Sequence, residues 1–356
     1  MSSLRHALIA KNENLPLEAI KSCCINTDKR GNPLPDLTAC PWCHRPFTEE
    51  EGNEDFTTSF MMLDQGCQSF FTHRGYFDRF FRVEKILGRG GQGQVLLVRH
   101  LIDGRDLGLL AMKIIPCDRV NLNPGLDEAI VLCALRHPNL IGYRHAWVEA
   151  WSADTRTCPS VPCLFLLMEY AGGGSLDQRL NQGDLPLESL LLDVCQGLYY
   201  LHQAGLMHRD LKPSNILLTT NLTALIGDLG CVRGSSQCVG TLAYLSPEIA
   251  TSDLLNEETC FTEASDAWSL GMTFYHALYG ELPFDEPSLQ TIASIQRIKV
   301  DRGSDRLRRV LNGFLQGDLS QRMSIREGIE ILSEDNPPIK RHYSLIGLLL
   351  LALLFA

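Results

Sequence analysis

The segment His208-Arg209-Asp210-Leu211-Lys212-Pro213-Ser214-Asn215 contains side chains that can act directly on phosphate chemistry. Asp210 can accept a proton from an incoming hydroxyl group. Lys212 can neutralise charge on a moving phosphoryl group, and Asn215 can bind a metal ion. The segment matches the pattern H-R-D-L-x-x-x-N in full, which predicts a phosphoryl-transfer site and argues against an incidental structural turn.

A second acidic motif, Asp228-Leu229-Gly230, follows thirteen residues after Asn215. Asp228 is expected to bind Mg²⁺ together with Asn215, because carboxylate and amide oxygens are ligands that Mg²⁺ prefers. Gly230 would permit a sharp turn after the acid.

A glycine-rich stretch, Gly88-Arg89-Gly90-Gly91-Gln92-Gly93-Gln94-Val95, fits G-x-G-x-x-G-x-V. Glycines allow backbone N–H groups to approach phosphates because no Cβ stands in the way. Taken alone, the stretch also fits a glycine-rich hairpin turn. A dinucleotide site would require a helix next, whereas a β-rich stretch follows.

Lys113 ends that β-rich stretch, where a charged group needs a partner. Glu128, on the next segment with helical spacing, is the candidate. A strand lysine paired with a helix glutamate would hold the α and β phosphates of a nucleotide. The alternative is a surface lysine and a solvated glutamate.

Further residues suggest regulation and support of the site. Arg209 can pair with a phosphate group on a downstream loop, and Ser235 and Ser236 are candidate acceptors of that phosphate. Thr241 is a further candidate for a regulatory role. A flexible loop with incidental serines is the alternative. Glu248 and Arg322 are predicted to form a buried ion pair, against the alternative of a lone surface arginine.

The elements that must position these residues follow from the spacing of apolar side chains. Strand-like runs are followed by helical spacing, so a strand-rich part leads into a helix-rich part and the class is α+β. Strands are expected at Val83–Leu87, Val95–Val98, Leu109–Ile115, Leu140–Trp147 and Leu164–Met168, and helices at Asp127–Leu135 and Leu187–His202.

The whole chain has 356 residues, 45% of them apolar and 21% charged, with a net charge of −10. These values exclude a disordered, collagen-like or multi-span membrane chain, and they disfavour a general nucleic-acid coat, which concentrates positive charge. Composition divides the chain into a Cys-containing region, a globular region, a linker with a basic flank and an apolar segment: residues 1–79, 80–332, 333–342 and 343–356.

The order of these motifs from about Phe80 to Leu332 resembles the eukaryotic protein kinase superfamily. Lys212, and Thr241 in Gly240–Tyr244, are similar to the serine/threonine branch. Two stretches, Tyr143–Glu149 and Val161–Phe165, together with an N-terminal Cys-Pro-x-Cys, resemble the IKS-type kinases and, more distantly, the translation-factor-directed PEK group.

The resemblance implies a two-lobed fold and an ATP- and Mg²⁺-dependent activity on protein Ser and Thr hydroxyls. It implies that Met168 is the gatekeeper, that Glu169 and Ala171 offer backbone groups to adenine, and that side chains sandwich the base. Two departures are Leu229, in place of phenylalanine, and Ser246, in place of alanine; leucine remains apolar, so activity is expected to survive. The implied nucleotide-binding residues are Leu87, Gly88, Gly90, Gly93, Val95, Ala111, Lys113, Met168, Glu169, Ala171, Leu217 and Asp228.

The N-terminal region contains Cys40-Pro41-Trp42-Cys43, which is half of a zinc site. A zinc-stabilised module, a thiol-exchange pair and reduced idle cysteines are the three alternatives. Because Met1–Asn14 contains no long apolar run, the chain is expected to lack a secretory signal. Its thirteen cysteines are therefore expected to be thiols or metal ligands in a reducing compartment.

The segment Tyr343–Ala356 is almost wholly apolar and follows the basic triplet Lys340-Arg341-His342. As a helix this segment would reach roughly 21 Å. That is shorter than the roughly 30 Å hydrocarbon core of a bilayer, which a helix of ~20 residues usually spans. The alternative is a helix docked on the rest of the chain. An anchor on the cytosolic face of an intracellular membrane is favoured because the segment is apolar all round and has a basic flank.

Two other functions compete with an active kinase. A non-catalytic pseudokinase scaffold would have no chemical need for Lys113, Glu128, Asp210, Asn215 and Asp228 together. A third reading makes the N-terminal cysteines the functional centre, with the kinase as effector.

Overall fold

The computed structural model describes residues 75–90, 93–116, 129, 133–151, 161–180, 185–231, 240–255, 257 and 260–334. The chain divides into two compact units. Unit 1 is Met1–Leu126 with Tyr143–Tyr170, and unit 2 is Asp127–Gly142 with Ala171–Ala356.

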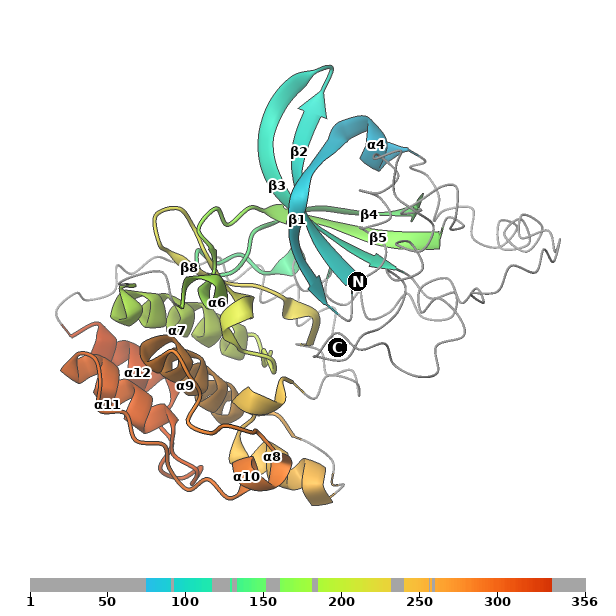
Figure 1. Ribbon diagram of the computed structural model, residues 1–356. Helices are drawn as coiled ribbons and strands as arrows, with labels where there is room; N and C mark the ends of the chain where they lie inside the picture. Colours follow the sequence, from blue (N-terminus) through green and yellow to red (C-terminus); the bar gives the residue numbers. More distant parts are fainter. Residues whose placement is uncertain are drawn as a thin grey trace. The chain divides into compact units, whose positions relative to one another are not determined.

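Unit 1 contains an antiparallel five-stranded sheet with the order β1-β2-β3-β5-β4 (Figure 1). All five strands confirm predicted strands, although Leu140 lies outside β4 and instead makes an isolated bridge to Ile226. The strands are β1 Phe81–Gly90, β2 Gly93–Ile102, β3 Arg105–Pro116, β4 Tyr143–Trp151 and β5 Val161–Glu169.

One face of this sheet carries the apolar core of unit 1. Since side chains alternate between the faces of a strand, every second residue of β2, β3 and β5 points to this core. Trp147 of β4 stacks on Phe165 with ring centroids 5.0 Å apart and on Phe81 at 5.7 Å. The other members of the cluster are Phe77, Leu96, Val98, Met112, Ile114, Cys163 and Leu167.

A short helix, α4 (Tyr76–Phe80), contributes to the same core and crosses the boundary expected near Phe80. Its attachment depends on Glu149 of β4, which is only 4% exposed. The Glu149 carboxylate accepts hydrogen bonds from Phe77 N at 3.1 Å and from Trp147 Nε1 at 3.0 Å. A buried carboxylate requires such donors, so this acid fixes α4 to the edge of the sheet.

Unit 2 is mainly helical, as the apolar spacing predicts. Two helices of seventeen residues form its centre, and α9 has a continuous buried run from Ser265 to Phe274, as expected for a helix enclosed by others. The helices are α6 Leu176–Arg179, α7 Leu187–Gln203, α8 Pro247–Leu255, α9 Glu263–Tyr279, α10 Leu289–Ala293, α11 Asp305–Phe314 and α12 Ile325–Leu332.

A small sheet in unit 2 carries the segments that hold the catalytic candidates. Its strands are β6 (Gly174–Ser175), β7 (Ile216–Leu218) and β8 (Ala224–Ile226), paired in that order. The short turns η1 (Pro213–Asn215), η2 (Leu229–Cys231) and η3 (Leu242–Tyr244) lie in or next to the predicted motifs.

The cysteines correct one expectation. Cys133, Cys163, Cys195 and Cys260 are not in disulfide bonds, in line with the prediction. Cys231, however, is disulfide-bonded, so the expectation of thiols or metal ligands throughout was wrong for this residue. Composition and compartment arguments do not resolve individual pairs, because a disulfide depends on two Cα atoms coming within about 7 Å in the folded chain.

Candidate active site

The Asp210 carboxylate is held by two neighbouring side chains in unit 2. Lys212 Nζ donates to Asp210 Oδ2 at 2.6 Å, and Thr241 Oγ1 donates to Asp210 Oδ1 at 2.8 Å. Lys212 Nζ also donates to Thr241 Oγ1 at 2.8 Å, which closes a three-membered network. The structure thus brings together two predicted catalytic residues and the threonine assigned a regulatory role.

Asn215 is fixed beside Asp210 by its amide nitrogen, which donates to Asp210 O at 2.7 Å and to Oδ2 at 3.3 Å. This leaves the amide oxygen as the atom suited to a hard cation. Gly227 N donates to Asn215 O at 2.8 Å, so the exposed Asp228 follows directly from a residue bonded to Asn215. The oxygen donors of Asn215 and Asp228 therefore fit Mg²⁺.

The backbone at this site is held in uncommon conformations. Arg209 has φ 70 and Asp228 has φ 55, in the left-handed region that non-glycine residues rarely adopt. Such conformations persist only where surrounding contacts hold them, and they cluster at functional sites.

Asp266 of α9 supplies those contacts for Arg209. Its Oδ1 accepts from Arg209 N at 2.9 Å, and its Oδ2 accepts from His208 N at 2.8 Å. His202 of α7 donates from Nε2 to the same Oδ2 at 2.8 Å. Burial alone would raise the pKa of Asp266, but the hydrogen bond and charge of His202 hold that pKa below its ordinary value. Asp266 is thus an ionised carboxylate that holds the backbone of the catalytic segment at His208 and Arg209.

The His208 side chain makes two further hydrogen bonds that hold the catalytic segment in place. Its Nε2 lies 3.0 Å from Gly227 O, and its Nδ1 accepts from Asp210 N at 3.3 Å. The neutral ring with the proton on Nε2 satisfies both contacts. One buried imidazole therefore connects the Asp210 segment to the Asp228 segment.

Gly240 joins the Thr241 segment to the same framework. Its φ is 76, and a Cβ placed there would lie 2.8 Å from Arg209 O. Only glycine combines this conformation with so close an approach. Thr241 therefore follows a residue that is packed directly on the catalytic segment.

In unit 1, four of the predicted nucleotide-binding residues share the sheet face opposite the core cluster. Val95 pairs with Lys113, and Ala111 pairs with Met168, so these four side chains point to one side. Lys113 is 6% exposed, so its charge is buried as expected, but the strand does not end there because β3 continues to Pro116. Such a lysine is suited to binding an anion on an otherwise apolar sheet face.

Gly93 begins β2 at the end of the glycine-rich stretch. Its φ is 150, and an added Cβ would lie 2.3 Å from Ile114 O. At Gly88 an added Cβ would meet nothing within 4 Å. The structure therefore requires glycine at position 93 for the close approach of two strands, in addition to any role toward phosphate.

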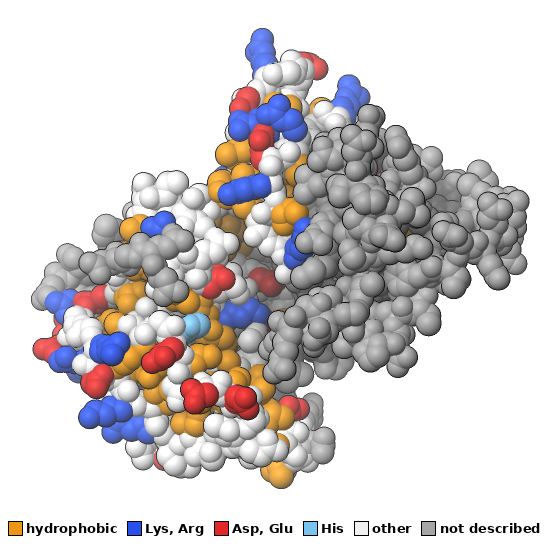
Figure 2. Space-filling model, in the orientation of Figure 1, with side chains coloured by type: hydrophobic (Ala, Val, Ile, Leu, Met, Phe, Trp, Pro, Cys, Tyr) orange, Lys and Arg blue, Asp and Glu red, His pale blue; other side chains and the backbone are white. Residues whose placement is uncertain are grey.

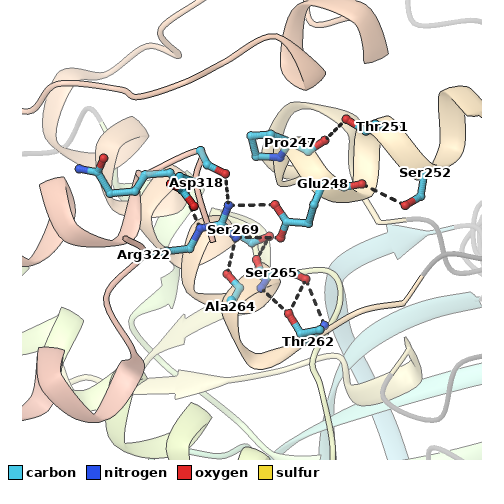
Figure 3. Close-up of polar contacts among 12 residues, drawn as sticks. Pro247, Glu248, Thr251, Ser252, Thr262, Ala264, Ser265, Ser269, Asp318 and Arg322 are labelled. Carbon is cyan, nitrogen blue, oxygen red and sulfur yellow. Dashed lines mark hydrogen bonds and ion pairs between the residues drawn. The ribbon is translucent and has the colours of Figure 1, made fainter. Parts of the chain in front are cut away.

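Glu248 and Arg322 form the predicted ion pair (Figure 3). Arg322 donates in a two-pronged arrangement, from Nη1 to Glu248 Oε1 at 2.7 Å and from Nη2 to Oε2 at 2.8 Å. The Arg322 side chain is fully buried and lies over the Trp268 ring at 5.2 Å. Burial would raise the pKa of Glu248, but Arg322 holds that pKa below its ordinary value. The pair ties α8 to the loop before α12.

The remaining predicted site residues are distributed as follows. Leu87 and Glu169 lie in unit 1, whereas Ala171 and Leu217 lie in unit 2. Leu229 is 1% exposed, as expected for an apolar anchor. Outside the described residues lie Glu128, Ser235, Ser236, Cys40 and Cys43. Among the described residues no group of three or more His, Cys, Asp or Glu could hold a metal ion.

Sequence reasoning missed the roles of His202, His208 and Asp266. The available signal was a charged residue within the apolar run of α9, since an acid placed there needs donors. The identity of those donors depends on packing between α7, α9 and the catalytic segment, which spacing alone does not give.

Comparison with known proteins places this arrangement in context. Residues 81–331 match the family described as protein kinase domain. The chain is 36% identical over 255 residues to the probable serine/threonine-protein kinase iksA of Dictyostelium discoideum, covering 62% of this chain and 26% of that protein. It is 30% identical over 265 residues to an Aurora kinase of Eremothecium gossypii, covering 69% of this chain and 67% of that protein.

A third relative is the serine/threonine-protein kinase Nek1 of Mus musculus, 29% identical over 240 residues. The match covers 64% of this chain and 18% of Nek1. The chain thus spans about a quarter of the length of iksA and less than a fifth of Nek1.

Proposed function

This chain belongs to the protein kinase superfamily, of the serine/threonine type, and from that premise we propose that it transfers the γ-phosphate of ATP to protein Ser or Thr hydroxyls. The observation that carries the proposal is the network in which Lys212 and Thr241 both contact the Asp210 carboxylate. A group that positions a hydroxyl nucleophile must itself be held in place, and this network does so.

Each residue has a role in the proposed reaction. Asp210 accepts the hydrogen bond of the substrate hydroxyl and orients its oxygen toward the phosphorus. Lys212 balances negative charge at the phosphoryl group, and Lys113 binds the phosphates that remain with the nucleotide. The backbone of Gly88–Gly93 covers the phosphates and excludes water. Catalysis is then positioning plus electrostatic stabilisation, with no covalent intermediate on the protein.

Asn215 and Asp228 would hold Mg²⁺, which supplies positive charge to the phosphate oxygens. The hydrogen bonds from the Asn215 amide nitrogen to Asp210 keep its oxygen available for that purpose.

The alternative of a catalytically inactive scaffold is less well supported. Asp210, Asn215, Asp228 and Lys113 are all present, although a scaffold has no chemical need to keep them together, and Asp266, His202 and His208 hold the catalytic segment in place. Radiolabelled ATP, Mg²⁺ and a Ser/Thr peptide library test the point. Transfer is expected with the natural chain and loss by about 10²–10³ with Asp210→Ala; no transfer by well-folded natural chain would favour the scaffold.

We also propose that Arg209 responds to phosphorylation at Ser235 or Ser236. Arg209 Nε is buried and has no hydrogen-bond partner among the described residues, while the guanidinium lies 5.5 Å from the Phe261 ring centre. A phosphate would provide an anionic acceptor for this group. Mass mapping of active protein should find one serine modified, and an active protein with both serines unmodified would contradict the idea.

Two further proposals concern segments outside the described residues. Cys40 and Cys43 are proposed to bind Zn²⁺, which elemental analysis of the purified chain would detect.

Residues 343–356 are proposed to attach the kinase to the cytosolic face of a membrane, and their deletion should move the protein to the unsedimented fraction. Within the described residues, no helix is long and apolar enough to cross a bilayer.

A further inference from the structure

A groove of about 740 Å³ lies in unit 2, away from the catalytic segment. It is bordered by the start of α7, the end of α9, the start of α11 and the last residue of α12. Its volume is in the range of sites that bury a drug-sized organic ligand. Its apolar wall includes Leu185, Leu187, Leu192, Leu278, Leu307 and Leu332.

Polar contacts at the rim of the groove join the start of α11 to α7. Ser304, at the start of α11, donates a hydrogen bond to Glu188 Oε2. Arg306 Nη1 lies 3.6 Å from Glu188 Oε1. The groove therefore has an apolar wall and a polar rim, which is the usual pattern of a binding site. Figure 2 shows apolar side chains reaching the surface of unit 2 among charged ones.

The chain leaves the described fold at this groove. Leu332 is both the last residue of α12 and part of the groove wall, and it is 5% exposed. Ser333 is 6% exposed, so the exit is still packed against unit 2. The linker that follows, residues 335–342, would span up to roughly 26–29 Å when extended. That length is ample for the next segment to return to the groove.

The next segment, Tyr343–Ala356, has the matching chemistry. It contains no charged residue and is rich in leucine. A continuous apolar segment in water is an interaction site or an aggregation hazard. A short linker places it near the groove at an effective concentration of the order of millimolar. A separate partner would need strong affinity to compete with an attached segment at that concentration.

We propose that residues 343–356 bind in this groove of the same molecule when no membrane is present. The same apolar side chains cannot contact the groove and lipid together, so docking and membrane attachment are competing states. The docking itself does not depend on kinase activity, and it deepens the proposed membrane attachment by giving the segment a second site.

A photo-crosslinker tests the occupant directly. In the full chain, Leu348 is replaced by p-benzoylphenylalanine, and the protein is purified without detergent and irradiated. The monomer is then isolated, and its crosslinked peptides are mapped by mass spectrometry. Crosslinks are expected to residues 185–192 and 303–307. Crosslinks confined to other parts of the chain, or formed only between molecules, would overturn the proposal.

Groove variants supply the second measurement. Leu278→Glu places a charge on the apolar wall, and Ser189→Trp fills the groove from an exposed position without removing a core side chain. Each should reduce the intramolecular crosslink at least tenfold. Leu255→Glu, at a leucine that is 60% exposed and outside the groove, should leave it unchanged. Equal crosslinking in all three variants would refute docking.

Sedimentation with phosphatidylcholine vesicles separates the two proposals for this segment. If groove docking and membrane attachment are both right, Leu278→Glu increases vesicle binding because residues 343–356 are released from the groove. Groove crosslinks without any vesicle binding would retain docking and reject the membrane attachment.

Discussion

The hydroxyl of Thr241 donates a 2.8 Å hydrogen bond to the carboxylate of Asp210, across a sequence separation of 31 residues. The same hydroxyl accepts from Lys212 Nζ at 2.8 Å. Thr241 is thus both donor to the proposed base and acceptor from the proposed phosphate-binding lysine. The position of the segment that begins at Gly240 is thereby coupled to the two groups proposed to act on the substrate.

Removing this hydroxyl should lower turnover while leaving the fold intact. Thr241→Val keeps the shape of the side chain but removes a hydrogen bond to a charged group, which is worth about 1.5–3 kcal/mol. If that bond persists in the transition state, kcat should fall roughly 10- to 100-fold with little change in KM for ATP. Steady-state kinetics measure both. Thr241→Ser, which restores the hydroxyl, should recover most of the rate, and a valine variant with natural kcat would rule out this positioning role.

Lys113→Met should reduce transfer by about 10²–10³, because one electrostatic contributor at the phosphates is lost. The matched control is Lys85→Met on β1, where the lysine is exposed. Both variants replace an ammonium by a thioether on the same sheet. Initial rates at saturating ATP, with circular dichroism to monitor folding, should separate them. Equal rates for the two variants would show that Lys113 has no special role.

Gly93→Ala should destabilise unit 1, because the new Cβ would meet Ile114 O at 2.3 Å. The backbone must shift or remain strained, at a cost of about 1–3 kcal/mol. Gly88→Ala is the control for stability, since its Cβ meets nothing within 4 Å. Thermal unfolding should show Tm lowered by several degrees for Gly93→Ala only. A similar small change in both variants would mean that the strand approach tolerates a side chain.

Local patterns predicted the strands and the catalytic segment well because their determinants are close in sequence. Short continuous apolar runs predicted strands such as β2 and β5, and the short spacing from Asp210 to Asn215 keeps these two groups in one segment that ends in the turn η1. The ion pair of Glu248 with Arg322, 74 residues apart, was predicted from the opposite charges of the two side chains, against the alternative of a lone surface arginine, and not through spacing.

Contacts that depend on packing between distant elements were beyond the sequence. Nothing in the spacing indicates that Glu149 accepts from Phe77 N, 72 residues earlier, or that Asp266 holds the backbone of Arg209. Both are buried acids that accept from a backbone N–H as well as from a side chain, and every residue type except proline carries such a backbone donor. The presence of a buried acid could be inferred, but its partner could not.

The ion pair between Glu248 and Arg322 should make stability depend on acid pH. Arg322 keeps the pKa of Glu248 below its ordinary value of 4.5. A carboxyl group with a depressed folded-state pKa stabilises the fold above its unfolded-state pKa, and this stabilisation is lost as pH falls through the folded-state value. Stability of the natural chain should therefore decline below about pH 4.5 in part through this group.

Glu248→Gln should remove that contribution and leave the fully buried Arg322 side chain without its counter-ion. Breaking a buried pair in this way costs about 3–5 kcal/mol, and the lower end is expected because the Glu248 side chain is 22% exposed. The matched control is Glu330→Gln, whose partner Arg326 is 72% exposed; that change should cost less than about 0.5 kcal/mol. Urea unfolding from pH 3 to 7 measures both. The difference in the free energy of unfolding between the natural chain and Glu248→Gln should be largest near neutral pH and should shrink toward pH 3. A difference that stays constant with pH would show that the charge of Glu248 contributes nothing to stability.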